Sequence, residues 1–418
     1  MSDSAERGRE QTAERDTDGT AGPGPEETAE RDTDRAAGPG PEETAERKRE
    51  RRSAAWQAAE RVLWRPGHQQ TVRSRLAWLN DGAESVYDLD RPVDMYGDRL
   101  VETLEERVAG LLGKEAAAFF PTGTMAQQVA LRCWAGRTGD ATVAMHALGH
   151  PEVHERHAFS SVSGLRPVRV TDEPRLPTAE EIRDFEEPFG SLLLELPLRD
   201  AGFVLPSWEE LVAVTEAARE RDAVVHFDGA RLWECTPRLG RPLDEIAGLA
   251  DSVYVSFYKS LDGLGGAAVA GPRTLIDEAK AWRHRYGGMV FQQFPTVLAA
   301  LIGLDRELPR LPAYVAHARV VAAALREGFA EAGVAWARVH PEEPHTHQFQ
   351  VWLPYDAEVL TDAAMLQTEE TGTGLFARWS RGGPGLALTE VTVAAPGLEW
   401  TAGDVKAAVA DFVARLPG

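Results

Sequence analysis

The chain has 418 residues, 43% of them hydrophobic and 27% charged, which is enough for two or three folded units with a sizeable core. Its 45 Lys and Arg against 66 Asp and Glu give a net charge of −21, which argues against nucleic acid and acidic membrane surfaces as partners. Only two cysteines occur, and no apolar run reaches the ~18 residues of a membrane span. We therefore expect a cytoplasmic protein without disulfides.

The first 55 residues differ in kind from the rest, because they contain no Val, Ile, Leu, Phe, Tyr or Trp. Residues 12–27 return almost unchanged as residues 28–43, a period of 16 residues. A structural repeat needs apolar side chains to stack on its neighbours, and this one offers only alanine. The sequence predicts a disordered acidic tail over 1–55, followed by an N-terminal segment over 56–93.

Beyond Trp56, short apolar runs alternate with amphipathic stretches, a pattern typical of parallel strands covered by helices. The predicted strands are Ala116–Phe120, Ala141–Met145, Ser191–Leu196, Ala223–Phe227, Ser252–Phe257 and Gly266–Ala270. The predicted helices between them are Leu100–Leu112, Met125–Trp134 and Ser207–Arg221. We expect these elements to form a large α/β domain over 94–308.

The pattern changes after residue 308, where a long amphipathic stretch predicts a helix over Tyr314–Ala332. The later elements are separated strands and a closing helix, predicted at Gln348–Leu353, Leu375–Trp379, Leu386–Val393 and from Thr401 onward. This arrangement predicts a smaller α+β domain over 309–418.

A turn that suits a phosphate follows the first predicted strand, at Pro121-Thr122-Gly123-Thr124. A turn that opens a helix offers unpaired backbone N–H groups, a hydroxyl and the positive end of the helix dipole. An ordinary capped turn would have the same sequence. No nucleoside-triphosphate loop occurs, and the glycine-rich Gly263–Gly266 precedes a predicted strand, where a dinucleotide fingerprint requires a helix.

Two apolar strands end in charged residues, the first in Asp228 and the second in Lys259, 31 residues later. Strand ends of this kind are where α/β proteins bind ligands, although a lone lysine there can simply reach the surface. Together with the phosphate turn they form the set that pyridoxal phosphate requires. The turn holds the phosphate, the aspartate keeps the pyridine nitrogen protonated, and the lysine forms a Schiff base.

These ordered motifs resemble the low-specificity L-threonine aldolases, in the β-eliminating lyase group of fold-type-I pyridoxal phosphate enzymes. The resemblance covers about Val93 to Val393, with its strongest stretches at Asp94–Asp98, Leu104–Ala116, Phe120–Leu131, Phe227–Trp233 and Asp251–Lys259. It implies the aspartate aminotransferase fold, an α/β domain with a mostly parallel seven-stranded sheet and a smaller α+β C-terminal domain.

The resemblance also assigns roles to individual residues. It makes Lys259 the Schiff-base lysine and Asp228 the partner of the ring nitrogen, and it places the phosphate on Gly123 and Thr124. Arg231, in the Asp-Gly-Ala-Arg motif, resembles the family arginine that engages the substrate carboxylate. A guanidinium group is suited to that task because it binds a carboxylate bidentately.

Four histidines crowd one short segment: His146, His150, His154 and His157. A metal site is disfavoured there, because Pro151 interrupts a helix through the set and no cysteine accompanies it. In the threonine aldolase family that this sequence resembles, a histidine that is followed five residues later by a glutamate stacks on the cofactor ring. His150 and Glu155 have that spacing. His150 is therefore our candidate base, with a surface histidine as the alternative.

The departures from the family pattern lie where its members touch the substrate. The histidine of the family's Glu-Asn-Thr-His motif is missing from Glu195 to Asp200, and Thr389 stands where the family has a carboxylate-binding arginine. Arg199 or Arg378 are possible replacements. The Gly-Gly-Gly-Met-Arg-Gln motif is also altered, at Tyr286 to Phe291.

The resemblance implies retro-aldol cleavage of a β-hydroxy-α-amino acid to glycine and an aldehyde. The open alternatives are β-elimination, racemisation or aldol transfer on a specialised amino acid, and a non-catalytic regulatory protein on the same fold. The resemblance further implies a homodimer or homotetramer whose sites lie at the subunit interface. Asp94–Asp98 and Tyr286–Gly288 are the segments expected to cross into the neighbouring subunit.

Overall fold

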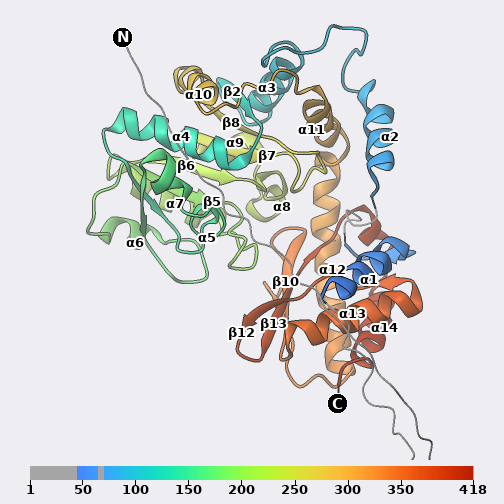
Figure 1. Cartoon of the computed structure of the whole chain (residues 1–418). Coiled ribbons are helices and arrows are strands. Elements are labelled where there is room, and N and C mark those ends of the chain that lie inside the picture. Colours follow the sequence, from blue (N-terminus) through green and yellow to red (C-terminus); the bar gives the residue numbers. More distant parts are fainter. Residues whose placement is uncertain (1–44, 65–69, 418) are drawn as a thin grey trace, which may run out of the picture. The chain divides into compact units, whose positions relative to one another are not determined.

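The computed structural model describes residues 45–64 and 70–417 (Figure 1), so most of the predicted tail lies outside the described residues. Its last part, however, is helical, because α1 spans Ala45–Ala58. Arg51 donates hydrogen bonds of 2.8 and 2.6 Å to the carboxylate of Glu369, and Trp56 is buried. The predicted tail was therefore wrong for residues 45–55, where a run rich in basic residues forms a charged helix whose Arg51 and Arg52 pair with Glu369 and Glu358.

A seven-stranded sheet forms the centre of the larger part of the structure. Its strands, in spatial order, are β2 (Ala116–Phe120), β8 (Ala267–Gly271), β7 (Ser252–Ser256), β6 (Val224–Gly229), β5 (Ser191–Glu195), β3 (Thr142–Met145) and β4 (Arg166–Arg169). Only β8 runs antiparallel to its neighbours, which confirms the predicted mostly parallel sheet. Strands that are buried on both faces read as continuous apolar runs, and this is why they were predictable from the sequence.

Helices accompany this sheet, some packed directly on its strands and others, such as the first, packed on a neighbouring helix. They are α2 (Val72–Ala83), α3 (Leu100–Leu111), α4 (Gly123–Thr138), α5 (His150–Val153), α6 (Ala179–Asp184), α7 (Trp208–Arg219), α8 (Thr236–Leu239), α9 (Leu243–Gly248), α10 (Arg273–Arg285) and α11 (Phe294–Arg306). The start of α7 shows why the sequence predicted it. The Ser207 hydroxyl accepts the N–H of Glu210, and the Glu210 carboxylate accepts the N–H of Ser207. This reciprocal cap fixes the first turn.

A separate antiparallel sheet follows in the C-terminal part. Its strands, in spatial order, are β12 (Ser380–Gly383), β13 (Leu386–Thr392), β10 (Gln348–Leu353) and β9 (Arg338–His340), and it packs with α12 (Leu311–Glu331), α13 (Ala357–Thr371) and α14 (Ala402–Val413). A short parallel pair, β1 (Arg61–Val62) and β11 (Thr373–Gly374), joins the N-terminal segment to it. The two large sheets fall on either side of residue 308, while the exact domain boundaries remain a prediction.

One predicted strand, Leu375–Trp379, was wrong. These residues are buried but irregular, and the ring of Phe376 packs 5.0 Å from that of Trp379 and 5.2 Å from that of Phe412. The apolar run fills an aromatic core as a loop, and the strand β12 begins only afterwards. In the described ranges no helix is both long and apolar enough to cross a membrane, and Cys133 and Cys235 are buried free thiols.

Candidate active site

The carboxyl ends of β2, β5, β6 and β7 meet at one edge of the large sheet, because these four strands run in the same direction (Figure 1). Asp228 lies at the end of β6 and pairs in register with Glu195 on one side and Tyr254 on the other. Lys259 follows β7 by three residues, and the helix α4 begins directly after β2. The edge therefore brings Asp228, Lys259 and the predicted phosphate turn together.

The predicted phosphate turn forms the N-terminus of α4. The Thr122 hydroxyl caps the helix by accepting the N–H of Met125, and among the described residues the N–H groups of Gly123 and Thr124 reach no acceptor. A Cβ added at Gly123 would lie 2.2 Å from the Tyr254 hydroxyl, so a side chain is excluded there. The turn thus presents two N–H donors at the positive end of a 16-residue helix.

Asp228 is almost completely buried, with 1% of its surface exposed. Its Oδ1 accepts the N–H of Ala230 at 3.1 Å, while Oδ2 has no hydrogen-bond partner among the described residues. Burial raises the pKa of this carboxyl group, and the nearby charge of Lys259 opposes that shift. A buried carboxylate oxygen without a partner is the acceptor that a protonated ring nitrogen would satisfy.

A row of hydrogen bonds that the sequence analysis missed leads toward Asp228. The Trp134 indole donates to Ser252 Oγ at 2.7 Å, Ser252 lies 2.7 Å from His226 Nδ1, and His226 Nε2 lies 2.9 Å from Gln127 Oε1. Within the described residues, neither Gln127 Nε2 nor Asp228 Oδ2 forms a hydrogen bond that meets the usual limits of distance and angle. The Gln127 side chain nevertheless lies near enough to Asp228 to help lower the pKa of that carboxyl group.

The one sequence signal for this row was the position of His226, two residues before Asp228 and therefore on the same face of β6. Burial lowers the pKa of His226 to about 3, so its ring is neutral. Because Gln127 Oε1 can only accept, Nε2 of His226 carries the ring proton, Nδ1 accepts a hydrogen bond from the Ser252 hydroxyl, and Ser252 Oγ accepts the indole N–H of Trp134. The direction of the whole row is fixed, and it leaves the Gln127 amide group as a donor.

Lys259 is half-buried, and several charges act on its amine. Burial lowers the pKa of Lys259, and the guanidinium group of Arg231 lowers it further, whereas Asp228 and Glu195 raise it. A lysine with a lowered pKa carries more of the neutral amine that attacks a carbonyl carbon.

Glu195, at the end of β5, is a second buried carboxyl group that the sequence analysis did not assign. Its Oε2 accepts the N–H of His150 at 2.7 Å and its Oε1 accepts the N–H of Arg199 at 3.2 Å. Burial, together with the charge of Asp228, raises the pKa of Glu195 to about 8. It therefore holds two loops in place and carries a proton near neutral pH.

His150 opens α5, and its Nε2 lies 4.0 Å from Glu155 Oε1. Burial and the charge of Lys259 lower the pKa of His150 to about 3, so its imidazole is neutral and keeps a ring nitrogen with a free lone pair. Burial raises the pKa of Glu155 to about 7, against hydrogen bonding from Thr124. His150 thus belongs to the site rather than to the open surface.

Of the neighbouring histidines, His146 points away from the site, whereas the ring of His154 lies 5.0 Å from that of His150. His146 Nε2 lies 2.6 Å from the carbonyl oxygen of Glu173, and His154 Nε2 lies 2.7 Å from Asp200 Oδ2. Within residues 45–64 and 70–417, no group of three or more His, Cys, Asp or Glu side chains is arranged to hold a metal ion.

Two arginines face the site. Arg231 stacks over the Phe203 ring at 5.3 Å, and its buried Nε has no hydrogen-bond partner among the described residues. Arg199 Nη2 donates to Glu390 Oε2 at 2.9 Å, and its charge contributes to the lowered pKa of His150. Arg378 is exposed, and only its carbonyl oxygen, which accepts the Thr389 hydroxyl, points inward. The structure favours Arg199 over Arg378 as the replacement for the missing family arginine.

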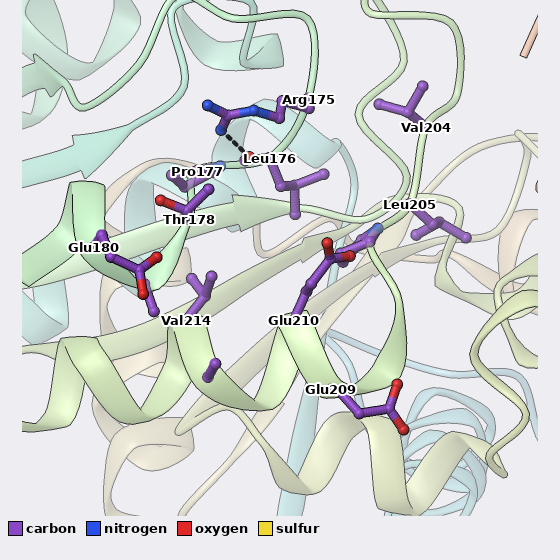
Figure 2. Close-up of a pocket in the computed structure, with 13 residues that line it drawn as sticks. Arg175, Leu176, Pro177, Thr178, Glu180, Val204, Leu205, Glu209, Glu210 and Val214 are labelled. Carbon is purple, nitrogen blue, oxygen red and sulfur yellow. Dashed lines mark hydrogen bonds between the residues drawn. The ribbon is translucent and has the colours of Figure 1, made fainter.

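A separate pocket of about 470 Å³ lies between the segment around α6 and the start of α7 (Figure 2). Arg175, Glu209 and Glu210 are among the residues that line it, and none of the predicted site residues does. It is therefore distinct from the site at the sheet edge.

The sequence matches the β-eliminating lyase family over residues 87–351. It is 32% identical over 245 residues to the low specificity L-threonine aldolase of Escherichia coli K12, covering 57% of this chain and 73% of that protein. It is 30% identical over 243 residues to low-specificity L-threonine aldolase 1 of Arabidopsis thaliana, covering 55% and 67%.

The chain belongs to the β-eliminating lyase family. A solved structure from Listeria monocytogenes, proposed to be an L-allo-threonine aldolase, superposes with a TM-score of 0.79 at 31% identity, covering 88% of this chain and 99% of that one. These likenesses confirm the family and the fold that the sequence motifs predicted.

Proposed function

We propose that the site at the sheet edge binds pyridoxal phosphate through the residues predicted from the sequence and cleaves the Cα–Cβ bond of a β-hydroxy-α-amino acid. By its family the chain is a pyridoxal phosphate-dependent carbon–carbon lyase of the threonine aldolase type. The observation that carries the proposal is the buried Oδ2 of Asp228, which lacks a partner among the described residues and lies at the same sheet edge as Lys259.

The residues present fit the cofactor at its phosphate, at its ring nitrogen and at the carbon that forms the covalent link. Gly123 and Thr124 offer two N–H donors for a phosphate, in a turn where a Cβ would collide with Tyr254. Asp228 offers an acceptor for a ring N–H, and Lys259 offers an amine for the covalent link. When bound there, pyridoxal phosphate supplies an electron sink for the pair left on the α-carbon.

The side chains around this position divide the remaining work. Arg231 and Arg199 carry the positive charges that orient a substrate carboxylate, provided that Arg199 exchanges its contact with Glu390 for the substrate. His150, neutral at physiological pH, accepts the proton of the β-hydroxyl group as the Cα–Cβ bond breaks. Its backbone is held by Glu195, which positions the imidazole.

The assignment of the lysine is tested by Lys259→Ala. We expect the purified variant to lose all borohydride-fixed cofactor, because Lys114, Lys280 and Lys406 of the described residues all make contacts elsewhere, whereas Lys114→Ala should retain it. Peptide mass spectrometry that finds the fixed cofactor on another lysine of the variant would refute the assignment.

The reaction is tested by incubating the loaded wild-type protein with L-threonine and L-allo-threonine. Aldol cleavage yields glycine and acetaldehyde in equal amounts. Ammonia with a 2-oxo acid would instead indicate β-elimination. Threonine with inverted configuration at Cα would indicate racemisation, and either result would overturn the proposed reaction.

We further propose that the active protein is a homodimer or homotetramer. Tyr96 and Phe291 pack edge to face at 5.3 Å on an exposed apolar surface that also includes Met95 and Val290. Gly288 in turn packs so closely against Met125, at the phosphate turn, that a Cβ would lie 2.5 Å from its sulfur. A second copy on this surface would lie beside the site, as the family resemblance implies. A cytoplasmic location remains a prediction from composition.

A further inference from the structure

Glu234 and His347 form a fully buried pair that the reaction described above does not use. Both side chains have no exposed surface, and His347 Nε2 lies 2.7 Å from Glu234 Oε2. Glu234 lies in the short 3₁₀ turn Leu232–Glu234 that follows β6, and His347 lies directly before β10 of the C-terminal sheet. The pair therefore joins the two sheets through one contact.

The hydrogen bonds fix the number of protons in this pair. His347 Nδ1 lies 2.7 Å from the carbonyl oxygen of Val393, which can only accept, so Nδ1 carries a proton. One further proton lies between Nε2 and Oε2, whichever atom holds it. The carboxyl group and the ring together are neutral overall, which explains how a glutamate can be completely buried here.

The same carboxylate oxygen reaches the loop that carries Lys259. The Ser260 hydroxyl donates to Glu234 Oε2 at 2.7 Å, and Ser260 is the residue that follows Lys259. On its other side, Glu234 donates its backbone N–H to the carbonyl oxygen of Arg231 at 3.2 Å. Glu234 thus connects Arg231 with the loop that carries Lys259. These are the two residues of the site whose positive charges repel each other.

We propose that Glu234, held by His347, is a positioning residue that fixes the spacing between Arg231 and the Lys259 loop. The proposal rests on the proposed role of Lys259. Without the pair, the turn after β6 and the loop after β7 would each lose a buried contact that leads to the C-terminal sheet.

The amine of Lys259 should report such a change. Burial and the charge of Arg231 lower its pKa, so a looser arrangement that admits water and separates the two cations raises it. The charged and titratable groups that act on Lys259 or respond to it are Arg231, Asp228, Glu195, Arg199, His150 and Glu155. Of these groups, only Arg231 lies at the 3₁₀ turn Leu232–Glu234, where it is the residue before the turn begins.

The test compares four full-length variants with the wild type: His347→Leu, Ser260→Ala, the double variant Glu234→Met/His347→Leu, and the control Gln367→Met. Gln367 is a buried polar residue that donates to the carbonyl oxygen of Ala408 and lies in α13, away from the pair. The double variant removes both members, so it leaves no unpaired buried charge and should recover much of the stability that His347→Leu loses.

Three measurements on each variant separate positioning from folding. Without cofactor, the pH dependence of acetic anhydride labelling at Lys259, followed by peptide mass spectrometry, gives the apparent pKa of the amine. With cofactor, the pH midpoint of the visible absorbance reports the same nitrogen, and denaturant midpoints give stability. We expect His347→Leu, Ser260→Ala and the double variant to raise both pH midpoints by about one unit, and Gln367→Met to leave them unchanged.

A double variant that restores both stability and the wild-type pH midpoints would overturn the proposal, because the pair would then serve folding alone. If the double variant does not fold, an unchanged midpoint in Ser260→Ala would overturn it in the same way. A labelling midpoint that shifts while the absorbance midpoint stays constant would refute Lys259 as the cofactor lysine and leave the positioning role standing.

Discussion

At the scale of single residues, the site is governed by two carboxyl groups that strand pairing places next to each other. Glu195 and Asp228 are partners in the register of β5 and β6, and both are buried. Two adjacent buried carboxylates repel, so one of them holds a proton more strongly than usual. Burial and the charge of Asp228 raise the pKa of Glu195 to about 8, against the two backbone N–H groups that its carboxylate accepts.

This raised pKa predicts how stability depends on pH. A carboxyl group whose pKa is higher in the folded than in the unfolded protein stabilises the fold at low pH, and that contribution is lost as the pH rises toward 8. We expect the cofactor-free wild type to lose roughly 2–4 kcal/mol more of its free energy of unfolding between pH 5 and pH 9 than Glu195→Gln. Denaturant unfolding at several pH values measures this, and parallel curves for the two proteins would contradict the assignment.

Much of the residue-level site was predictable because its members end apolar strands. Asp228 and Lys259 are visible in the sequence as charges after buried runs, and Gly123 as a turn before a helix. Glu195 gives the same signal at the end of β5 and was overlooked, whereas Gln127 and the pair of Glu234 and His347 were not predictable, because their importance comes from neighbours distant in the sequence. A buried polar residue within an apolar run gives no indication of which partner neutralises it.

At the scale of elements, the start of α4 is the part least tolerant of change. Alanine at Gly123 would place a Cβ 2.2 Å from the Tyr254 hydroxyl and 3.0 Å from its Cζ. We expect Gly123→Ala to cost roughly 1–3 kcal/mol and to weaken cofactor binding, measured by denaturant unfolding and by cofactor titration. Gly123→Ala/Tyr254→Phe removes the closer clash and should recover part of both losses, whereas no recovery would place the cause elsewhere.

The N-terminal helix α1 gives a second prediction at this scale. Removing residues 1–44 should leave Tm unchanged, because that segment has no large apolar side chain to bury. Removing residues 1–58 should lower Tm by a few degrees, because it also removes the buried Trp56 and the Arg51 contact with Glu369. Equal Tm values for the two truncated proteins would show that α1 contributes nothing to the fold.

Two strands buried on both faces were predicted to the residue, and the amphipathic α3 and β13 were predicted to within one residue. The strands β2 and β10 have the predicted bounds, whereas the edge strand β4 carries two arginines in four residues and was not predicted. Leu375–Trp379 was predicted as a strand because it is apolar, yet its aromatic side chains are buried by the packing of a loop. Apolar sequence reports burial, and burial alone does not determine backbone conformation.

At the scale of the whole molecule, the exposed apolar surface around Tyr96 and Phe291 predicts self-association. We expect light scattering to give at least twice the 45.7 kDa mass of one chain. Phe291→Asp should shift the protein toward monomers and reduce turnover, while Val320→Asp, exposed on α12, should change neither. An active monomer across a wide concentration range would refute the shared-site arrangement.

The common direction of β2, β5, β6 and β7 has a consequence for how such a protein changes over evolutionary time. The groups that fit the cofactor lie at or just beyond strand ends, where any insertion would displace the whole set. Arg199, four residues beyond β5, and His150, five beyond β3, lie on connecting segments that can vary in length and composition. A lineage can therefore exchange one substrate for another by rewriting these loops, while the cofactor chemistry is inherited intact.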